Sequence, residues 1–396
     1  VRVFENIGGV WTQLGQDIDG ESAGDNSSEV SLSDDGTLLI IGARNNATNG
    51  LFSGHARVFE YISGNWTQIG QNIYGSLTSE QAFGGSVSIN SIGNKVAISS
   101  YDTPLNYGLV RVFQNTGNSW NQIGQDIFGE SAGDQSGRDI YLNSNGNILA
   151  IGSRFNDDNG TDAGHVRVYE YLSGVWTQIG QDIDGENPGD AATYNLLNGS
   201  VALSDDGSIV AIGALRNGDN GVYSGHVRVF ENNNGNWIQV GQDIDGENAN
   251  DQSGSSVSLN SDGDILAIGA RAANSFTGQV RVFKNISGNW LQLGQDIDGE
   301  NISDQSGQVS ISNDGNLVAI GAFVNQNSGH VRVFALDSSN IVPCSDLGCL
   351  DPLALNFDPY ATVDDSSCIY PVYGCIDSLA LNFDPYATVD DSSCIY

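Results

Sequence analysis

WTQIGQDIDGE, residues 176–186, contains the heptapeptide GQDIDGE, which the chain repeats many times. Four verbatim copies begin at Gly15, Gly180, Gly241 and Gly294, and two relaxed copies, GQDIFGE and GQNIYGS, begin at Gly124 and Gly70. An acidic segment repeated in this way has two interpretations. It is either a set of metal-binding loops or the end of a strand in a repeated fold.

A second string, VRVF, recurs with the same spacing. VRVF-like segments lie 51 to 61 residues apart and begin at Val1, Ala56, Val110, Val166, Val227, Val280 and Val331. Each unit also contains a segment like SVSLS, one like LAIGA and one like WTQ. SVSLS and VRVF alternate with period two, and LAIGA is a short apolar run typical of a strand buried on both faces. The glycine of turns such as SDG suits a tight hairpin.

Four antiparallel strands in each repeat of about 55 residues predict an all-β fold, a β-propeller of four-stranded blades over residues 1–335. Six repeats favour six blades. The chain begins on a third strand, and the last repeat, 308–334, stops after its third. We therefore expect the N-terminal WTQLGQDI strand to complete the last blade, which leaves one VRVF strand spare. That strand would belong to a seventh blade if the chain extends upstream.

The charge of the chain excludes some partners. Its 48 acidic and 14 basic residues give a net charge of -34, which repels nucleic acid and anionic membrane surfaces. No run of 18 or more apolar residues could span a membrane. The chain has no Met and starts within a repeat, so we expect a processed or partial chain.

The heptapeptide and the loop after it place four acids along one segment in each intact copy. Alternating carboxylates followed by a glycine resemble the start of a Ca²⁺ loop, but a third ligand before the glycine is missing. The relaxed copies lose acids and keep the strand end and the glycine, which favours a crossover between blades, with Ca²⁺ as the second interpretation. The candidate ligands are Asp17, Asp19, Glu21, Asp25, Asp182, Asp184, Glu186, Asp190, Asp243, Asp245, Glu247, Asp251, Asp296, Asp298, Glu300 and Asp304.

Other residues recur at fixed positions and are interpreted as structural. The VRV arginines are expected to pair with acids such as those of the heptapeptide, and the tryptophans to pack between blades. The histidines precede VRV at a position where other repeats have Leu109 or Gln279, so they are not catalytic. No catalytic motif is present. Binding specificity is expected where the repeat breaks, at 187–198 and 101–107.

The last 60 residues differ in composition. Residues 336–347 read as a linker, followed by two near-identical modules at 348–370 and 374–396. The simplest cysteine pairing is Cys349–Cys368 and Cys375–Cys394, with Cys344 unpaired, and it predicts an oxidising, extracellular setting. Oxygen ligands for Ca²⁺ recur in both modules, although the same residues could simply cap turns. They are Asp351, Asn356, Asp358, Asp364, Asp365, Asp377, Asn382, Asp384, Asp390 and Asp391.

The pattern GxSVSLSxDGxxLAIGAxxxxxxGHVRVFxxxxGxW resembles the FG-GAP repeats of integrin α-subunit propellers and their bacterial relatives. FGGSVSIN at 83–90 and the IGA triplets at Ile41, Ile212, Ile268 and Ile320 stand where that family has its FG and GAP elements. The two C-terminal modules are similar to GCxDPxAxNxDPxAxxDDxSC repeats near the C-termini of secreted surface proteins. The resemblance implies a secreted or surface propeller, and such propellers typically have seven blades.

These features predict a calcium-stabilised extracellular protein that acts in adhesion or structural assembly, without catalysis. Its propeller loops would bind a protein or glycan, and its C-terminal modules would provide self-assembly or attachment, including a surface filament. The alternative is a propeller glycoside hydrolase or another polysaccharide-active enzyme, which would need an asymmetric acidic cluster.

Overall fold

The computed structural model describes residues 1–75, 81–190, 200–324 and 329–336, and short stretches at 347–348, 363–364, 373–374, 380, 389–390 and 392–395. The chain divides into two compact units, Val1–Leu336 and Asp337–Tyr396. The first unit is a six-bladed β-propeller, so the predicted all-β fold is confirmed.

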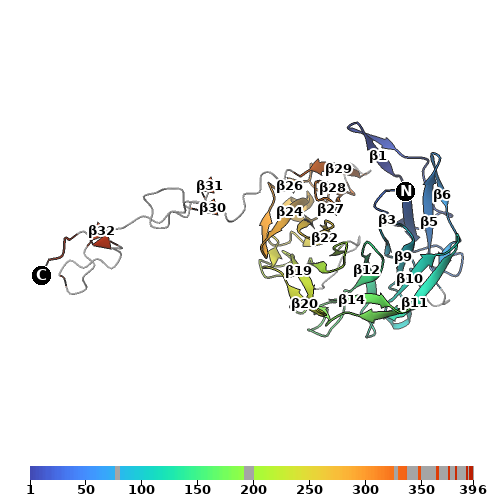
Figure 1. The fold of residues 1–396 in the computed structure, drawn as a ribbon, viewed down its shortest axis with the longest axis horizontal. Helices are drawn as coiled ribbons and strands as arrows, with labels where there is room; N and C mark the ends of the chain where they lie inside the picture. The colour runs from blue at the N-terminus through green and yellow to red at the C-terminus, as the bar shows by residue number, and fades with distance from the viewer. Residues whose placement is uncertain are drawn as a thin grey trace. The chain divides into compact units, whose positions relative to one another are not determined.

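Six antiparallel sheets surround a central axis, with the first strand of each repeat nearest the centre (Figure 1). Blade 1 contains β3 (Ser27–Leu32), β4 (Leu38–Ala43), β5 (His55–Ile62), β6 (Asn65–Gln68) and β7 (Ile73–Tyr74). Blade 2 contains β8 (Val87–Ile89), β9 (Lys95–Ser100), β10 (Leu109–Asn115) and β11 (Trp120–Phe128). Blade 3 contains β12 (Ser136–Leu142), β13 (Ile148–Ser153), β14 (His165–Leu172), β15 (Val175–Gln178) and β16 (Ile183–Asp184).

The next two blades repeat this order, and the last has three strands. Blade 4 contains β17 (Val201–Leu203), β18 (Ile209–Ala214), β19 (His226–Asn233), β20 (Asn236–Gln239) and β21 (Ile244–Asp245). Blade 5 contains β22 (Ser253–Leu259), β23 (Ile265–Ala270), β24 (Gln279–Ile286), β25 (Asn289–Gln292) and β26 (Ile297–Asp298). Blade 6 contains β27 (Ser306–Ile311), β28 (Leu317–Ala322) and β29 (His330–Ala335). Helical turns in the described residues are limited to Pro104–Asn106 and α1 (Ala273–Phe276).

The hydrophobic core lies between neighbouring blades. Ala150 and Val166 of blade 3 cluster with Val201, Val210 and Trp237 of blade 4. The second strands carry much of this core because both of their faces are covered, and β13 is buried along all but its first residue. Each blade therefore depends on the next for stability.

The ring closes at the turns between first and second strands. In these turns a backbone N–H of one blade donates to a carbonyl of the next, at Asp34 to Ser91, Ser91 to Ser144, Ser144 to Asp205, Asp205 to Ser261 and Ser261 to Asn313. A side-chain bond from Asn313 Nδ2 to Asp34 Oδ2, 3.0 Å long, joins the last blade to the first.

The N-terminal strands do not complete the last blade, so that prediction is wrong. β1 (Phe4–Ile7) pairs with β2 (Val10–Gln13) in a separate two-stranded sheet, and blade 6 ends at β29. The spare VRVF segment keeps its own fourth strand because a short turn joins the two, whereas β29 is distant in sequence. This hairpin packs on blade 1, where Trp66 Nε1 donates to the Leu14 carbonyl at 2.8 Å.

The second unit is described only in part. β30 (Leu347–Gly348) pairs in parallel with β31 (Val363–Asp364), and β32 (Tyr373–Gly374) pairs with β33 (Val389–Asp390). Cys394 is disulfide-bonded. Cys344, Cys349, Cys368 and Cys375, and the side chains of the C-terminal candidate ligands, lie outside the described residues.

Candidate functional site

One end of the ring, which we call the crossover face, carries both the crossovers between blades and the loops that join second to third strands. In blade 3, Ser136 at the start of β12 pairs with Ser153 at the end of β13. His165 at the start of β14 pairs with both Ser153 and Asp184. The heptapeptide, the histidines, the break at 101–107 and residues 187–190 of the other break therefore share this face.

The first half of the heptapeptide attaches its blade to the next one. Gly180 has a φ of +73°, and a Cβ there would lie 2.7 Å from the Gly235 carbonyl oxygen. The Nε1 of Trp237 donates to the Ile179 carbonyl at 2.9 Å, and Gln181 donates to the Trp237 carbonyl at 2.7 Å. This arrangement confirms a structural role for the heptapeptide and for the buried tryptophans of the complete blades.

The acids of one heptapeptide point to different partners. Asp182 accepts from Gln178 of its own blade. The Asp184 carbonyl accepts from Arg228 Nη2 of the next blade at 2.6 Å, and the Glu186 carboxylate lies 3.6 Å from the same arginine. Asp190 is buried and accepts from the Asn187 N–H at 3.0 Å. The four acids of a predicted set therefore do not form a single group.

Among the described residues, the structure instead brings together two groups of acids and a histidine, each across a blade junction and each with its ligand atoms within 4.8 Å of one another. The first is Glu130, Asp158, His165 and Asp182, and the second is Glu186, Asp219, His226 and Asp243. Asp182 and Glu186 come from one heptapeptide and enter different groups. Sequence reasoning included both of these acids but not the histidines, Glu130 or the loop aspartates.

His55 provides a test of the electrostatics at these junctions. Its ring is fully buried, and burial lowers its pKa, although Glu21 at 3.6 Å acts in the opposite direction. The unfolded chain therefore takes up this proton at a higher pH than the folded chain does. The stability contributed by neutral His55 is complete above the unfolded pKa of about 6.5 and is lost as pH falls toward the lowered folded pKa.

We expect His55→Gln, which places in blade 1 the residue found at position 279, to reduce this acid sensitivity. Between pH 7 and pH 5 the melting temperature of the variant should fall less than that of the wild type. Thermal unfolding across this range measures the difference. A difference between the two proteins that stays constant with pH would contradict the assignment to His55.

Most arginines occupy fixed positions of the repeat, in VRV or, at Arg44, Arg154 and Arg271, directly after the second strand. The VRV arginines make the expected contacts, and four of them donate to heptapeptide carbonyls, in the pairs Arg57–Asp19, Arg228–Asp184, Arg281–Asp245 and Arg332–Asp298. Apart from the two lysines, five arginines remain, at 44, 138, 154, 216 and 271. Such residues are of special interest in a protein of net charge -34.

Arg138 lies on the innermost strand β12 and is only 7% exposed. Its guanidinium carbon is 4.3 Å from the centre of the Tyr101 ring, and its Nε has no hydrogen-bond partner in the part of the chain that the structure describes. Contact with the ring restrains the guanidinium, and Arg57 and Arg332, which donate through Nη2, have the same unpartnered Nε. A buried cation of this kind requires a partner of opposite charge.

Two further arginines belong to this region, and we call Arg44, Arg138, Arg154 and Tyr101 the arginine cluster. Arg44 donates to the Tyr101 hydroxyl at 3.0 Å. Arg154 follows β13, whose last residue pairs with the first residue of β12, so Arg154 and Arg138 lie at the same end of adjacent strands. The cluster spans blades 1 to 3.

Sequence reasoning missed Arg138, although the sequence contained a signal for it. In the first strand of blade 3, Arg138–Asp139 replaces the Gly85–Ser86 of blade 2, and both charged residues are buried. Asp139 accepts from Ser200 and from the Val201 N–H of the next blade. Tyr101 was expected at a break in the repeat, whereas most of the other break, 191–198, lies outside the described residues.

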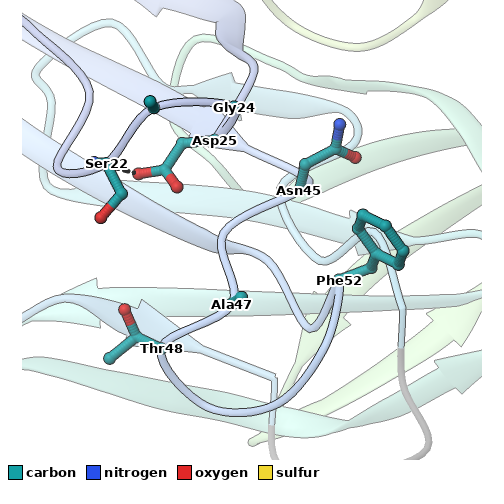
Figure 2. A pocket seen from close by; sticks show the side chains of 8 residues that line it. Ser22, Gly24, Asp25, Asn45, Ala47, Thr48 and Phe52 are labelled. Carbon is teal, nitrogen blue, oxygen red and sulfur yellow. Dashed lines mark hydrogen bonds between the residues drawn. The ribbon is translucent and has the colours of Figure 1, made fainter.

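A pocket of about 480 Å³ opens on the same face in blade 1. It is lined by the crossover residues 22–25 and by Asn45, Ala47, Thr48 and Phe52 (Figure 2). The Asp25 carboxylate accepts from the Ser22 N–H at 2.8 Å and from Asn46 at 3.1 Å. The residues of the arginine cluster do not line this pocket.

Fold and site together define an all-β, six-bladed propeller with a local positive cluster near its axis. No protein-family model matches the chain, and neither does any curated protein, so the resemblance to FG-GAP repeats and to C-terminal surface repeats has no support of that kind.

Several solved propellers share the fold across most of both chains. A provisionally named 6-phosphogluconolactonase of Bacteroides uniformis is 13% identical with a TM-score of 0.57, over 84% of this chain and 85% of that one. The periplasmic gluconolactonase of Pseudomonas aeruginosa is 19% identical with a TM-score of 0.54, over 86% and 90%. A second provisional 6-phosphogluconolactonase, from Bacteroides fragilis, is 16% identical with a TM-score of 0.52, over 83% and 88%.

These comparisons contradict the prediction of a non-catalytic adhesion or assembly protein, which is corrected accordingly. Three propellers with the same fold are named as lactonases, two of them provisionally. The earlier prediction was wrong because it was based on repeat symmetry and acidic composition, and both describe the scaffold. At these identities the likeness establishes the fold only. In the described residues, no helix has the length and apolar character needed to cross a bilayer.

Proposed function

We propose that the propeller is a hydrolase that opens lactones or related esters of anionic sugar acids. The observation that carries the proposal is Arg138, a buried guanidinium stacked on Tyr101 with its Nε unpartnered among the described residues. The lactonase names of propellers with the same fold support the reaction class.

The chemistry of the arginine cluster suits such a substrate. A guanidinium binds a carboxylate or phosphate through parallel hydrogen bonds, and a buried one does so without competition from water. Attack of water on a lactone carbonyl develops negative charge on oxygen, which a fixed neighbouring cation stabilises. Arg138 would bind the anionic group, and Arg44 and Arg154 would add positive potential at the reacting ester.

The test is a hydrolysis assay on 6-phosphogluconolactone and on neutral gluconolactone, with and without Arg138→Gln. Losing one partner of a buried charge pair removes about 2 kcal/mol or more, so kcat/KM for the phosphorylated lactone should fall at least about 30-fold. The neutral lactone should be affected much less. Lys284→Gln is the matched control. It also removes one positive charge, but from β24 of blade 5, away from the strand end at the crossover face.

Two results would overturn the proposal. One is the absence of lactone hydrolysis above the spontaneous rate in the wild type. The other is an equal effect of Arg138→Gln and Lys284→Gln on the phosphorylated substrate. Release of reducing sugar from a polysaccharide, without lactone hydrolysis, would support a glycosidase instead.

The second unit is the basis for a proposed location outside the cytoplasm. The cysteine spacing and the disulfide at Cys394 support this location, and one propeller with the same fold is named as periplasmic. Ca²⁺ binding by the Asp-rich modules, and attachment through them to a partner, are proposed from their sequence.

A further inference from the structure

Two junctions of the ring, between blades 2 and 3 and between blades 3 and 4, collect more negative charge than their surroundings balance. At the first junction, the ligand atoms of Glu130, Asp158, His165 and Asp182 all lie within 4.8 Å of one another. Arg167 Nη1 lies 3.3 Å from Glu130 and provides one positive charge against three carboxylates. This leaves two negative charges, and Glu186, Asp219 and Asp243 with Arg228 give the same balance at the second junction.

The histidine in each group is an independent sign of a missing ligand. The side chains of His165 and His226 are 0% and 1% exposed. Neither ring nitrogen of either residue has a hydrogen-bond partner among the described residues. His165 Nδ1 faces the carboxylates, 3.7 Å from Asp182 Oδ2 and 4.0 Å from Asp184 Oδ1. Buried polar atoms are normally satisfied, so these nitrogens require a partner.

Blades 5 and 1 show the same position without the full set of ligands. In blade 5, Gln279 replaces the histidine and its amide donates to Asp296 at 2.9 Å and to Glu247 at 3.4 Å. In blade 1, Thr48 and Asn72 replace the two aspartates, and the Asn72 amide donates to Glu21 at 2.9 Å. Amide donors thus contact the remaining acids in blades 1 and 5, although the buried His55 ring of blade 1 also has no hydrogen-bond partner among the described residues.

Neutral imidazole is the form of histidine that binds metals.

We infer that each of these two groups binds one divalent transition-metal cation of the Zn²⁺ or Mn²⁺ class. A divalent ion balances the two surplus negative charges and gives the buried imidazole a partner. One nitrogen and three oxygen ligands suit such an ion, because Ca²⁺ sites use oxygen ligands alone.

The bound ions would connect neighbouring blades. Glu130 and Glu186 lie on crossovers that enter blades 3 and 4, whereas the other ligands of each group belong to the blade entered. Metal binding would therefore stabilise the ring at these junctions.

The experiment uses the full chain, with Zn²⁺ as the probe, and compares the wild type with variants built from the residues of blade 1. Asp158→Thr with Asp182→Asn removes the first site, and Asp219→Thr with Asp243→Asn removes the second. Thr48→Asp with Asn72→Asp creates the same set around His55 and Glu21. Metal content after dialysis, calorimetric titration and thermal unfolding with and without EDTA are measured.

We expect each double substitution that removes a site to eliminate one bound Zn²⁺ per chain, or to lower the Zn²⁺ affinity of that site on the order of 100-fold or more. We also expect the double variant Thr48→Asp with Asn72→Asp to bind one additional Zn²⁺ per chain. EDTA should lower the melting temperature of the wild type more than that of a variant lacking both sites. Unchanged Zn²⁺ stoichiometry in the removal variants, or equal EDTA shifts, would overturn the inference. Ca²⁺ bound with higher affinity than Zn²⁺ at these groups would do so as well.

Discussion

Replacing Trp237 with alanine is expected to lower the free energy of unfolding of the propeller by about 4 kcal/mol, since buried Trp→Ala changes remove 3–5 kcal/mol. Trp237 is 4% exposed and packs in the core cluster shared by blades 3 and 4. Its Nε1 donates to the Ile179 carbonyl at 2.9 Å, and that carbonyl would lose its donor. Chemical denaturation and thermal unfolding would measure the loss.

Trp11 is the matched control for this change. It occupies the same repeat position, but the described structure has no blade packed before it, and its side chain is 50% exposed. Trp11→Ala should change stability by only about 0.5 kcal/mol, as is usual for surface positions. Similar losses in the two variants would show that the tryptophans do not join the blades.

Replacing Gly185 with alanine is the second change with a large expected effect. A Cβ on Gly185 would lie 2.1 Å from the Ala163 carbonyl oxygen, and backbone atoms at that distance must move. The Gly185 N–H also donates to the Gly164 carbonyl at 2.7 Å, so the strand end cannot shift without losing this bond. We expect a loss of about 3 kcal/mol, at the upper end of the range for overpacking, and a lower melting temperature.

Gly218→Ala separates the close approach from a general effect of losing glycine. At Gly218 the nearest atom to a Cβ would be 3.8 Å away, and neither glycine has a positive φ. This variant should be neutral or slightly more stable, by about 0.4–1 kcal/mol, because alanine reduces the entropy of the unfolded chain. A comparable loss at both positions would contradict the argument from packing.

The sequence predicted the blade because its signals are local. Period-two alternation, glycine turns and the repeat spacing indicated four strands per unit, and the structure pairs them in that order in blades 1 to 5. The relaxed heptapeptides also showed that its strand end and glycine mattered more than its acids. Gly180 and Gly185 lie where two segments meet too closely for any side chain.

The sequence did not predict contacts that form only when blades pack against each other. Asp182 and Glu186 are four residues apart, but they turn to different junctions because the chain crosses between blades there. Arg138 and Tyr101 come from different blades, and their contact depends on how the inner strand of blade 3 packs against the end of the second strand of blade 2. The WTQLGQDI strand near the N-terminus was also assigned to the wrong sheet.

The sequence by itself therefore determined the repeat, the strands and the propeller class, since each follows from contacts between residues close in the chain. The tertiary structure decided which acids share a site and where a positive charge is buried. Those properties depend on residues about 30 to 60 positions apart in sequence that meet across a blade junction. The repeat pattern contains no information on such pairs beyond its own symmetry.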